Sequence, residues 1–175
     1  MLRIVQSVPS PKAEPIKQWL AREGARRLDE VAAELDEDQR RQLLRGEVAQ
    51  QNTSLNDVAS AHGLTTSRDF AIFHDFDYKG LYNGETARDI ATRKGVPKGR
   101  ILDYMGSEEL AANWFRITQA ESKLRKLADE GVTGKMLANQ THYSMGKDVR
   151  QFILDHSGTP PEQLPTPAES IQELE

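Results

Sequence analysis

The chain has 175 residues, of which 37% are hydrophobic and 29% charged, and it contains no cysteine. This length suits one ordinary domain or two very small ones. Without cysteine the chain holds neither disulfides nor thiolate metal sites, which is typical of a reducing compartment. No apolar run approaches the roughly 20 residues that cross a bilayer, and the first residues do not resemble a signal peptide. We therefore expect a cytoplasmic protein with no membrane partner.

Charge is distributed unevenly along the chain, whose formal net charge is −4. Residues 88–150 hold 12 bases and 8 acids, whereas residues 151–175 hold 5 acids and no base. A basic segment followed by an acidic tail has two interpretations. It indicates a surface for a polyanion such as DNA, or only the ordinary variation of solvated helix faces.

The pattern of apolar residues predicts an all-α fold, because no alternating run of β-branched residues indicates a strand. Apolar residues at helical spacing predict a helix that starts after Pro15 and a long polar helix over residues 36–62. Ser67 and Asn83 are residue types that cap helix N-termini, so we expect two short helices to begin there. These helices form the first part of the predicted fold.

Helix signals in the second half predict a short helix and then two long ones. Pro97 is expected to open the short helix, and Ser107, which two acidic residues follow, a long helix to about Glu130. Two glycines separate it from a second long helix that ends near His156. Helices joined by so short a turn form an antiparallel hairpin. In the tail, Thr166 begins a capping box, which predicts a short last helix.

Residues 87–104 fit most of the template of a helix-turn-helix, in which a small residue precedes the turn glycine by four positions. Here the small residue is Ala91, the glycine is Gly95, and an apolar anchor follows at Ile101. Lys94 occupies one position that is usually apolar. Such a unit would present basic residues to DNA, and the alternative is an ordinary connection between two helices. The candidate DNA-contacting residues are Arg93, Lys94, Lys98 and Arg100.

The long hairpin carries further basic residues at spacings that place several of them on shared helix faces. Arg116 and Lys123 lie seven residues apart, and Lys147 and Arg150 lie three apart. A row of cations can follow a phosphate backbone, and Tyr104 and Tyr143 can supply stacking, although solvated surface bases and aromatic residues at the edge of the core are also compatible with this pattern. The candidate nucleic-acid-binding residues of this second group are Arg116, Lys123, Arg125, Lys126, Lys135, Lys147 and Arg150.

A metal-dependent nuclease is the least favoured interpretation. His74 and Asp77 are three residues apart and can share a helix face, but a divalent ion needs further ligands, and Asp75 points to another face. The sequence also has no glycine-rich nucleotide-binding loop. We therefore predict a protein that is not an enzyme and that has no catalytic residues, no metal and no cofactor.

Several distinctive strings follow one another in the second half of the chain. They are YKGLYNGETA (residues 78–87), ILDYMG (101–106), ELAAN (109–113), RITQAE (116–121), THY and GKDVR within residues 141–150, and LPTP (164–167). Together they resemble the distal region of the DNA-damage-inducible protein D family. The string SPKAEPIKQWL (residues 10–20) is similar to the place where the N-terminal BRO domain of that family, a domain of the phage antirepressor type, ends.

We expect four segments, the first from the resemblance and the others from the pattern of predicted helices. Residues 1–35 correspond to the remnant of a BRO-type domain, so the DNA binding attributed to that domain is not expected of this chain. Residues 36–80 form a helical connector, and residues 81–158 hold the helix-turn-helix-like unit and the long hairpin. Residues 159–175 form a Pro-rich acidic tail with a short helix. Whether the chain is a fragment of a longer protein stays open.

The resemblance also implies a role in the bacterial SOS response or in prophage regulation, and it supplies no catalytic residue. We predict a non-enzymatic regulator that binds single- or double-stranded DNA, or a DNA-bound protein such as a recombinase filament. The alternative is a dimeric interaction module of the antirepressor kind with no direct DNA contact. A homodimer is expected because long helices with one apolar stripe often bury that stripe across a two-fold axis.

Overall fold

The computed structural model describes residues 35–156 and 158–174 and shows helices and connecting segments, with no strand in these ranges. The all-α prediction is confirmed. The chain divides into two compact units at Arg40 and Arg41, and the described residues of the first unit are 35–40, which include the start of one helix. The expected remnant of a BRO-type domain and the helix after Pro15 lie outside the described residues. None of the described helices is long and apolar enough to cross a membrane.

The long polar helix predicted over residues 36–62 is α3 (Glu37–Ala61). It begins with a capping box. The Asp36 carboxylate accepts a hydrogen bond from the Gln39 backbone N–H at 2.8 Å, and the Gln39 side-chain oxygen accepts one from the Asp36 N–H at 3.0 Å. Val48 and Leu55 are fully buried. The sparse apolar positions of this helix are therefore the ones that attach it to the core.

Helix α4 (Ser67–Leu81) also begins with a capping box, one residue before the predicted cap at Ser67. The Thr66 hydroxyl accepts from the Asp69 N–H at 3.1 Å, and the Asp69 carboxylate accepts from the Thr66 N–H at 3.0 Å. Lys135 donates to the same carboxylate and, with these backbone hydrogen bonds, holds the pKa of Asp69 well below its usual range. The ion pair thereby connects the start of α4 to the helix that begins at Lys135, far along the chain.

Helix α5 (Ala87–Lys94) begins three residues later than predicted, because Thr86 and not Asn83 is its N-cap. Asn83 lies in the preceding turn with φ of 52°, a left-handed conformation that asparagine tolerates better than most residues. Gly95 ends the helix in the left-handed conformation, with φ of 69°, as a C-terminal glycine commonly does.

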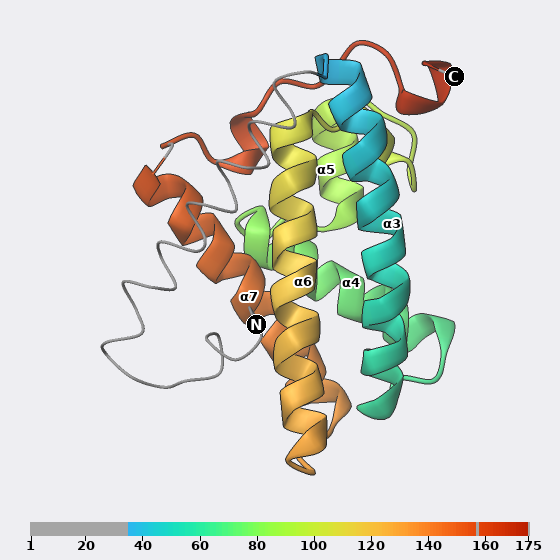
Figure 1. Cartoon of the computed structure of the whole chain (residues 1–175), viewed down its shortest axis with the longest axis vertical. Coiled ribbons are helices and arrows are strands. Elements are labelled where there is room, and N and C mark those ends of the chain that lie inside the picture. The colour runs from blue at the N-terminus through green and yellow to red at the C-terminus, as the bar shows by residue number, and fades with distance from the viewer. Residues whose placement is uncertain (1–34, 157, 175) are drawn as a thin grey trace. The chain divides into compact units, whose positions relative to one another are not determined.

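The predicted long hairpin is present as α6 (Ser107–Asp129) and α7 (Lys135–His156), which run in opposite directions and pack against each other (Figure 1). Gly131 and Gly134 have positive φ values of 75° and 152° in the connection. Such backbone conformations are accessible to glycine without the steric cost that a Cβ brings, so the two glycines make the short reversal possible.

The prediction of a short helix that opens at Pro97 is wrong. The chain turns at residues 98–99, and a four-residue 3-10 helix, η1 (Ile101–Tyr104), follows. Gly99 has φ of 81°, a left-handed conformation that ends any α-helix begun at Pro97. The helix-turn-helix-like unit therefore has its first helix and its turn, but its second element is too short to lie along a DNA groove as a recognition helix does.

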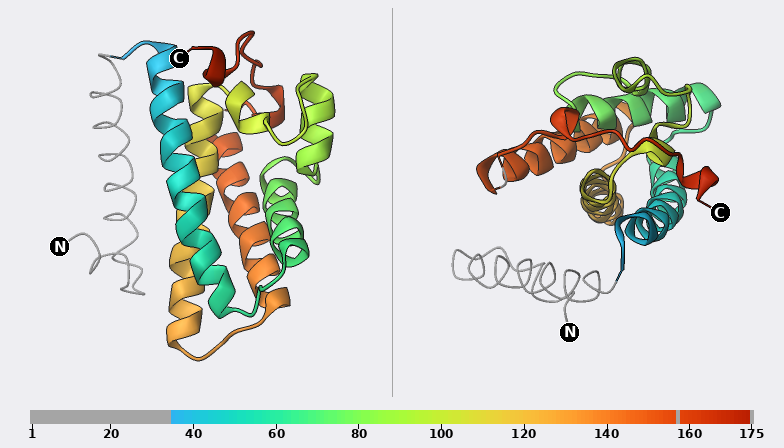
Figure 2. Two further views of the ribbon diagram at one scale, coloured as in Figure 1. Left: turned by 90° about the vertical axis from the view of Figure 1, so that its right-hand side faces the viewer. Right: turned by 90° about the horizontal axis from the view of Figure 1, so that it is seen from above.

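The tail crosses the same end of the second unit as α5 and η1 (Figure 2). It holds two short 3-10 helices, η2 (Pro161–Gln163) and η3 (Ile171–Glu173). The prediction of a helix that begins at Thr166 is wrong in position. The capping box forms four residues later, where the Ser170 hydroxyl accepts a hydrogen bond from the Gln172 N–H. Ile171 is buried, so the tail is part of the core rather than an appendage.

The core consists of two clusters of buried apolar residues, one among α3, α4, α6 and α7 and one around α5, η1 and the tail. Helices α4 and α7 lie side by side and run in the same direction (Figure 2). They meet most closely at Gly80 and Gly146, where a Cβ on Gly146 would lie 2.8 Å from the backbone nitrogen of Leu81. Only glycine allows this approach, which sets the geometry of the face that the two helices share.

Candidate functional site

A buried ion-pair cluster connects helices α4, α6 and α7 in the second unit. Asp77 on α4 pairs with Arg116 on α6 and lies 3.0 Å, Oδ1 to Nε2, from His142 on α7. Both Asp77 and Arg116 are 1% exposed. The guanidinium also lies 4.9 Å from the centre of the Tyr78 ring, a cation–π distance. In such an environment each charge is stable only when the other is present, because either one alone would be an uncompensated buried charge.

A second set of buried polar groups continues from this cluster towards α5. The Asn113 amide accepts from Arg116 and donates to the Tyr82 hydroxyl at 2.9 Å. The Tyr82 hydroxyl donates to the Glu109 carboxylate at 2.9 Å, and the Lys94 ammonium donates to the same carboxylate at 2.8 Å. The Lys94 and Glu109 side chains are fully buried. One connected chain of hydrogen bonds therefore runs from α7 to α5 through the core.

Burial dominates the protonation of these groups. It raises the pKa of Glu109, although Lys94 and the Tyr82 hydroxyl oppose this effect. It raises the pKa of Tyr78 to about 12 and that of Tyr82 well above its usual range. It lowers the pKa of His142 well below its usual range. Because the polar atoms of the cluster are shielded from solvent, their arrangement holds the helices together and does not offer an acid or a base to a substrate.

The residues considered for a metal site do not converge. The His74 imidazole Nε2 lies 3.0 Å from the Asn56 side-chain oxygen, whereas Asp77 is occupied by Arg116 and His142. Among the residues that the structure describes, no group of three histidine or acidic side chains could hold a metal ion. The pairing of His74 with Asp77 that the nuclease interpretation requires is therefore not formed.

Most of the basic residues predicted around α5 form ion pairs with acids or donate hydrogen bonds to the tail. Arg93 donates to the Glu85 carboxylate at 2.9 to 3.0 Å and to the backbone carbonyl of Glu162 at 2.9 Å. Arg100 donates to the Ser170 hydroxyl at 2.8 Å. Lys94 is buried, which corrects its expected place on a DNA-facing surface. It fills the usually apolar position of the template because Glu109 neutralises its charge.

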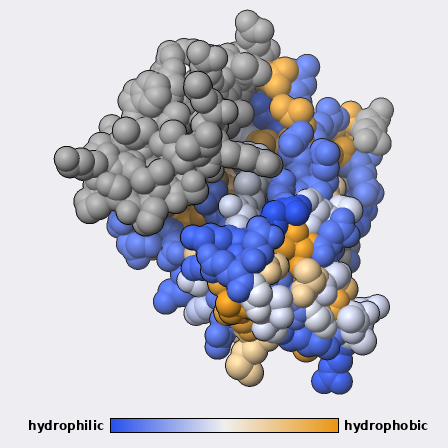
Figure 3. Space-filling view, turned by 60° about the horizontal axis from the view of Figure 1, so that its bottom comes forward, coloured by the Kyte–Doolittle hydropathy of each residue, from blue (hydrophilic) through white to orange (hydrophobic). Residues whose placement is uncertain are grey.

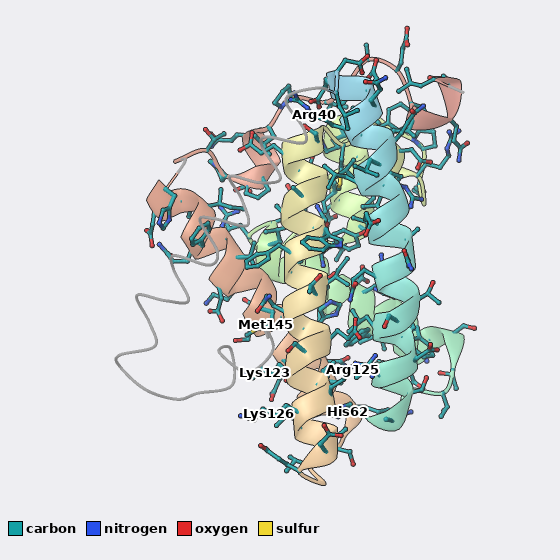
Figure 4. The ribbon with its side chains drawn as sticks, in the orientation of Figure 1. Arg40, His62, Lys123, Arg125, Lys126 and Met145 are labelled. Carbon is teal, nitrogen blue, oxygen red and sulfur yellow. The ribbon has the colours of Figure 1, made fainter. Side chains whose placement is uncertain are left out.

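On the hairpin, the predicted row of cations is also interrupted. Arg116 lies in the core and cannot reach a phosphate backbone, so its predicted role is corrected. Arg125 pairs with Glu121 at 2.6 Å on the side of α6 that faces α3, whereas Lys123 and Lys126 lie on the other side (Figure 4). The remaining pairs of the predicted residues are Lys126 with Glu130 (3.9 Å), Lys135 with Asp69 (2.9 Å) and Arg150 with Glu162 (2.5 Å).

Three of the predicted residues are exposed and have no acidic partner in the described part of the chain: Lys98, Lys123 and Lys147. The structure does not gather them, because Lys98 follows α5 in the turn, Lys123 is on α6 and Lys147 is on α7. The predicted set of eleven therefore does not form one continuous basic surface.

The structure instead gathers two lysines and two aromatic rings on the face that α4 and α7 share. The Lys79 ammonium lies 5.5 Å from the centre of the Phe76 ring, and the Lys147 ammonium lies 5.9 Å from the centre of the Tyr143 ring. The two rings meet edge to face at 6.5 Å. The prediction from sequence missed Lys79 and Phe76. The available signal was a lysine three or four residues after an aromatic residue on both helices.

Comparison with known proteins agrees with the resemblance seen in the sequence. Residues 35–174 match the DinD C-terminal domain family. The chain is similar to DNA damage-inducible protein D of Escherichia coli (strain K12), with 48% identity over 148 residues that cover 84% of this chain. The matched region is 53% of the length of the E. coli protein, so the chain spans about half of this relative. The chain belongs to the DinD C-terminal domain family.

Proposed function

We propose that the chain is a non-enzymatic regulator of the response to DNA damage that acts by binding a DNA-bound protein assembly, such as a recombinase filament. The name of the E. coli relative supports the link to DNA damage. The observation that carries the mode of action is that eight of the eleven predicted DNA-contacting cations are paired within the fold and the other three are not gathered in one place. A surface for naked DNA needs several unpaired cations in a row, because each phosphate contact adds to affinity.

The proposal includes a cytoplasmic location and no cofactor. It is tested by fluorescence anisotropy with labelled single-stranded DNA, double-stranded DNA and a recombinase filament assembled on single-stranded DNA, between about 50 and 200 mM salt. We expect binding to the filament and little binding to either naked DNA. Failure to bind the filament would overturn the proposal. Tight binding to naked DNA that weakens steeply with salt would favour the direct-DNA alternative instead.

A second candidate function is a dimeric interaction module of the antirepressor kind. It is favoured by a small apolar groove between α6 and α7, lined by Phe115, Val149, Phe152 and Leu164 among others, in which Phe115 and Phe152 are partly exposed. Such a groove can be covered by a second copy across a two-fold axis. The molecular mass at micromolar concentration tests this alternative, and a monomer would count against it.

A further inference from the structure

A groove opens on the surface between the first turns of α4 and α7. It has a volume of about 420 Å³ and a mainly apolar surface; its apolar lining residues are Leu64, Ile72, Phe76 and Met136, and its polar ones are Asp69, Lys135, Asn139 and Gln140. Met136 is 73% exposed and Ile72 is 39% exposed, so the groove presents apolar surface to solvent. Hydrophobic surface is visible between hydrophilic residues at the end of the molecule where α6 and α7 are joined (Figure 3). Methionine adapts its shape to different partners, which suits a binding surface.

The groove continues into the pair of lysines on the same two helices. Phe76 lines the groove and also contacts Tyr143 and Lys79, and Tyr143 in turn contacts Lys147. Neither Lys79 nor Lys147 has an acidic partner among the described residues. The acid that lines the groove, Asp69, is occupied by Lys135. Two lysines that make no ion pair with the described residues therefore lie next to the groove, and the acid on which Lys79 acts at longer range is Asp89, whose pKa it helps to lower.

The dimensions of this surface fit a short peptide. Lys147 lies eleven positions after Met136 on α7, which corresponds to about 16 Å of helix. That length matches about three turns of a bound helix or about five residues of an extended chain. One such segment is long enough to place an apolar side chain in the groove and a carboxylate next to the lysines.

We propose that the groove and the two lysines bind an acidic peptide segment that carries one or two large apolar side chains and belongs to a partner protein. The apolar surface of the groove favours a peptide over a nucleic acid, since two cations make few phosphate contacts and the lysine that lines the groove, Lys135, is paired with Asp69. This inference rests on the proposed function, namely that the chain acts by binding a protein, and adds where and by which chemistry the protein is bound.

The probes are three labelled peptides of about 12 residues, rich in glutamate, with two leucines spaced three, four or seven positions apart. A peptide with serine in place of both leucines and an oligothymidylate of similar length serve as comparators. We expect at least one leucine peptide to bind with a Kd below about 100 µM and both comparators to bind at least about tenfold more weakly. No binding by any leucine peptide, or equal binding by the serine peptide, would overturn the proposal. Preferred binding of the oligothymidylate would also overturn it.

Two variants test the location. Met136→Glu changes an exposed side chain, and the double variant K79E/K147E changes a half-buried and an exposed lysine; each should weaken peptide binding by about tenfold or more. Leu43→Glu on α3 and Lys123→Glu on α6 are matched controls, because these side chains are exposed and lie outside the groove, and both should bind normally. Equal loss in controls and groove variants would overturn the assignment.

The same variants separate the groove from the function. If filament binding persists in the groove variants, the filament is not bound through the groove, which overturns the inference that the groove takes the partner protein, and the proposed function stands. If the unmodified chain binds the peptides but not the filament, the proposed function is wrong and the groove stands.

Discussion

The region of α5 and the tail and the face shared by α4 and α7 both carry basic residues. They differ in whether those residues form ion pairs within the fold. Around α5, arginines and a lysine are held by Glu85, Glu109 and the tail. On the α4–α7 face, Lys79 and Lys147 lie over aromatic rings and make no ion pair with an acid in the described part of the chain. A basic segment therefore indicates a binding surface only when no other segment of the same fold supplies the opposite charge.

The first test removes a charge from the interior. Arg116→Ala leaves Asp77 buried without its cation, and we expect a loss of about 3–5 kcal/mol in the free energy of unfolding. Urea unfolding measures this change. The matched control is Arg125→Ala on the same helix, whose surface pair with Glu121 should contribute no more than about 1 kcal/mol. Similar losses in the two variants would contradict the division between structural and surface charges.

The interior should also make the fold sensitive to acid. Burial, together with electrostatic interactions with His142 and Arg116, lowers the pKa of His74 from its usual 6.5 to about 4. Between these values the unfolded chain binds the proton and the folded chain does not, so stability falls as the pH is lowered from about 6.5 to about 4. The contribution of His74 is on the order of 3 kcal/mol. Unfolding measured across this range should show a smaller slope in His74→Gln, and an unchanged slope would contradict the assignment.

The close contact of α4 and α7 gives a third test, because it forms the face that carries the groove. Gly146→Ala places a methyl group 2.8 Å from the Leu81 nitrogen and 3.0 Å from the Asp77 carbonyl oxygen. We expect a loss of about 1–3 kcal/mol, as in other overpacked interiors. Gly46→Ala on α3 is the control. It meets no atom within 4 Å and should stabilise the helix by up to about 1 kcal/mol. Thermal unfolding compares them.

The weakest effect should come from the tail. Burial works against the charge of Glu162, but its hydrogen bonds and its attraction to Arg150 hold the pKa of this carboxyl below the usual range. Glu162→Gln should cost about 0.5–1 kcal/mol of stability. It also leaves Arg150 without its acid, so weak DNA binding at low salt should increase. An unchanged affinity for DNA at low salt would show that the tail does not limit access to these cations.

Much of the helical framework could be predicted because it depends on local patterns. Val48 and Leu55 mark the buried stripe of α3, and Gly131 and Gly134 mark the turn of the hairpin. The errors arose where a local signal had a competitor nearby. Thr86, for example, supplies a better cap than Asn83 because Asp89 three residues later completes the capping box.

The candidate site could be predicted only in part, since its character depends on contacts between distant segments. Arg116 lies seven residues before Lys123, a spacing typical of bases on one exposed helix face. No residue near it in the sequence indicates that it will instead be buried and paired with Asp77 on another helix. Arg41 is similarly buried, because it donates to backbone carbonyls of Met105 and Glu169 far along the chain. Lys94, by contrast, stands in an apolar position of the template, which was a local sign of burial.

The most direct test of protein binding through the α4–α7 face compares filament binding by the unmodified chain, K79E/K147E and K98E/K123E. All four lysines are without acidic partners in the described residues, so the two variants change the charge equally but on different surfaces. We predict that K79E/K147E binds the recombinase filament at least about tenfold more weakly, while K98E/K123E stays within about twofold of the unmodified chain. Equal or greater loss in K98E/K123E would contradict binding through this face.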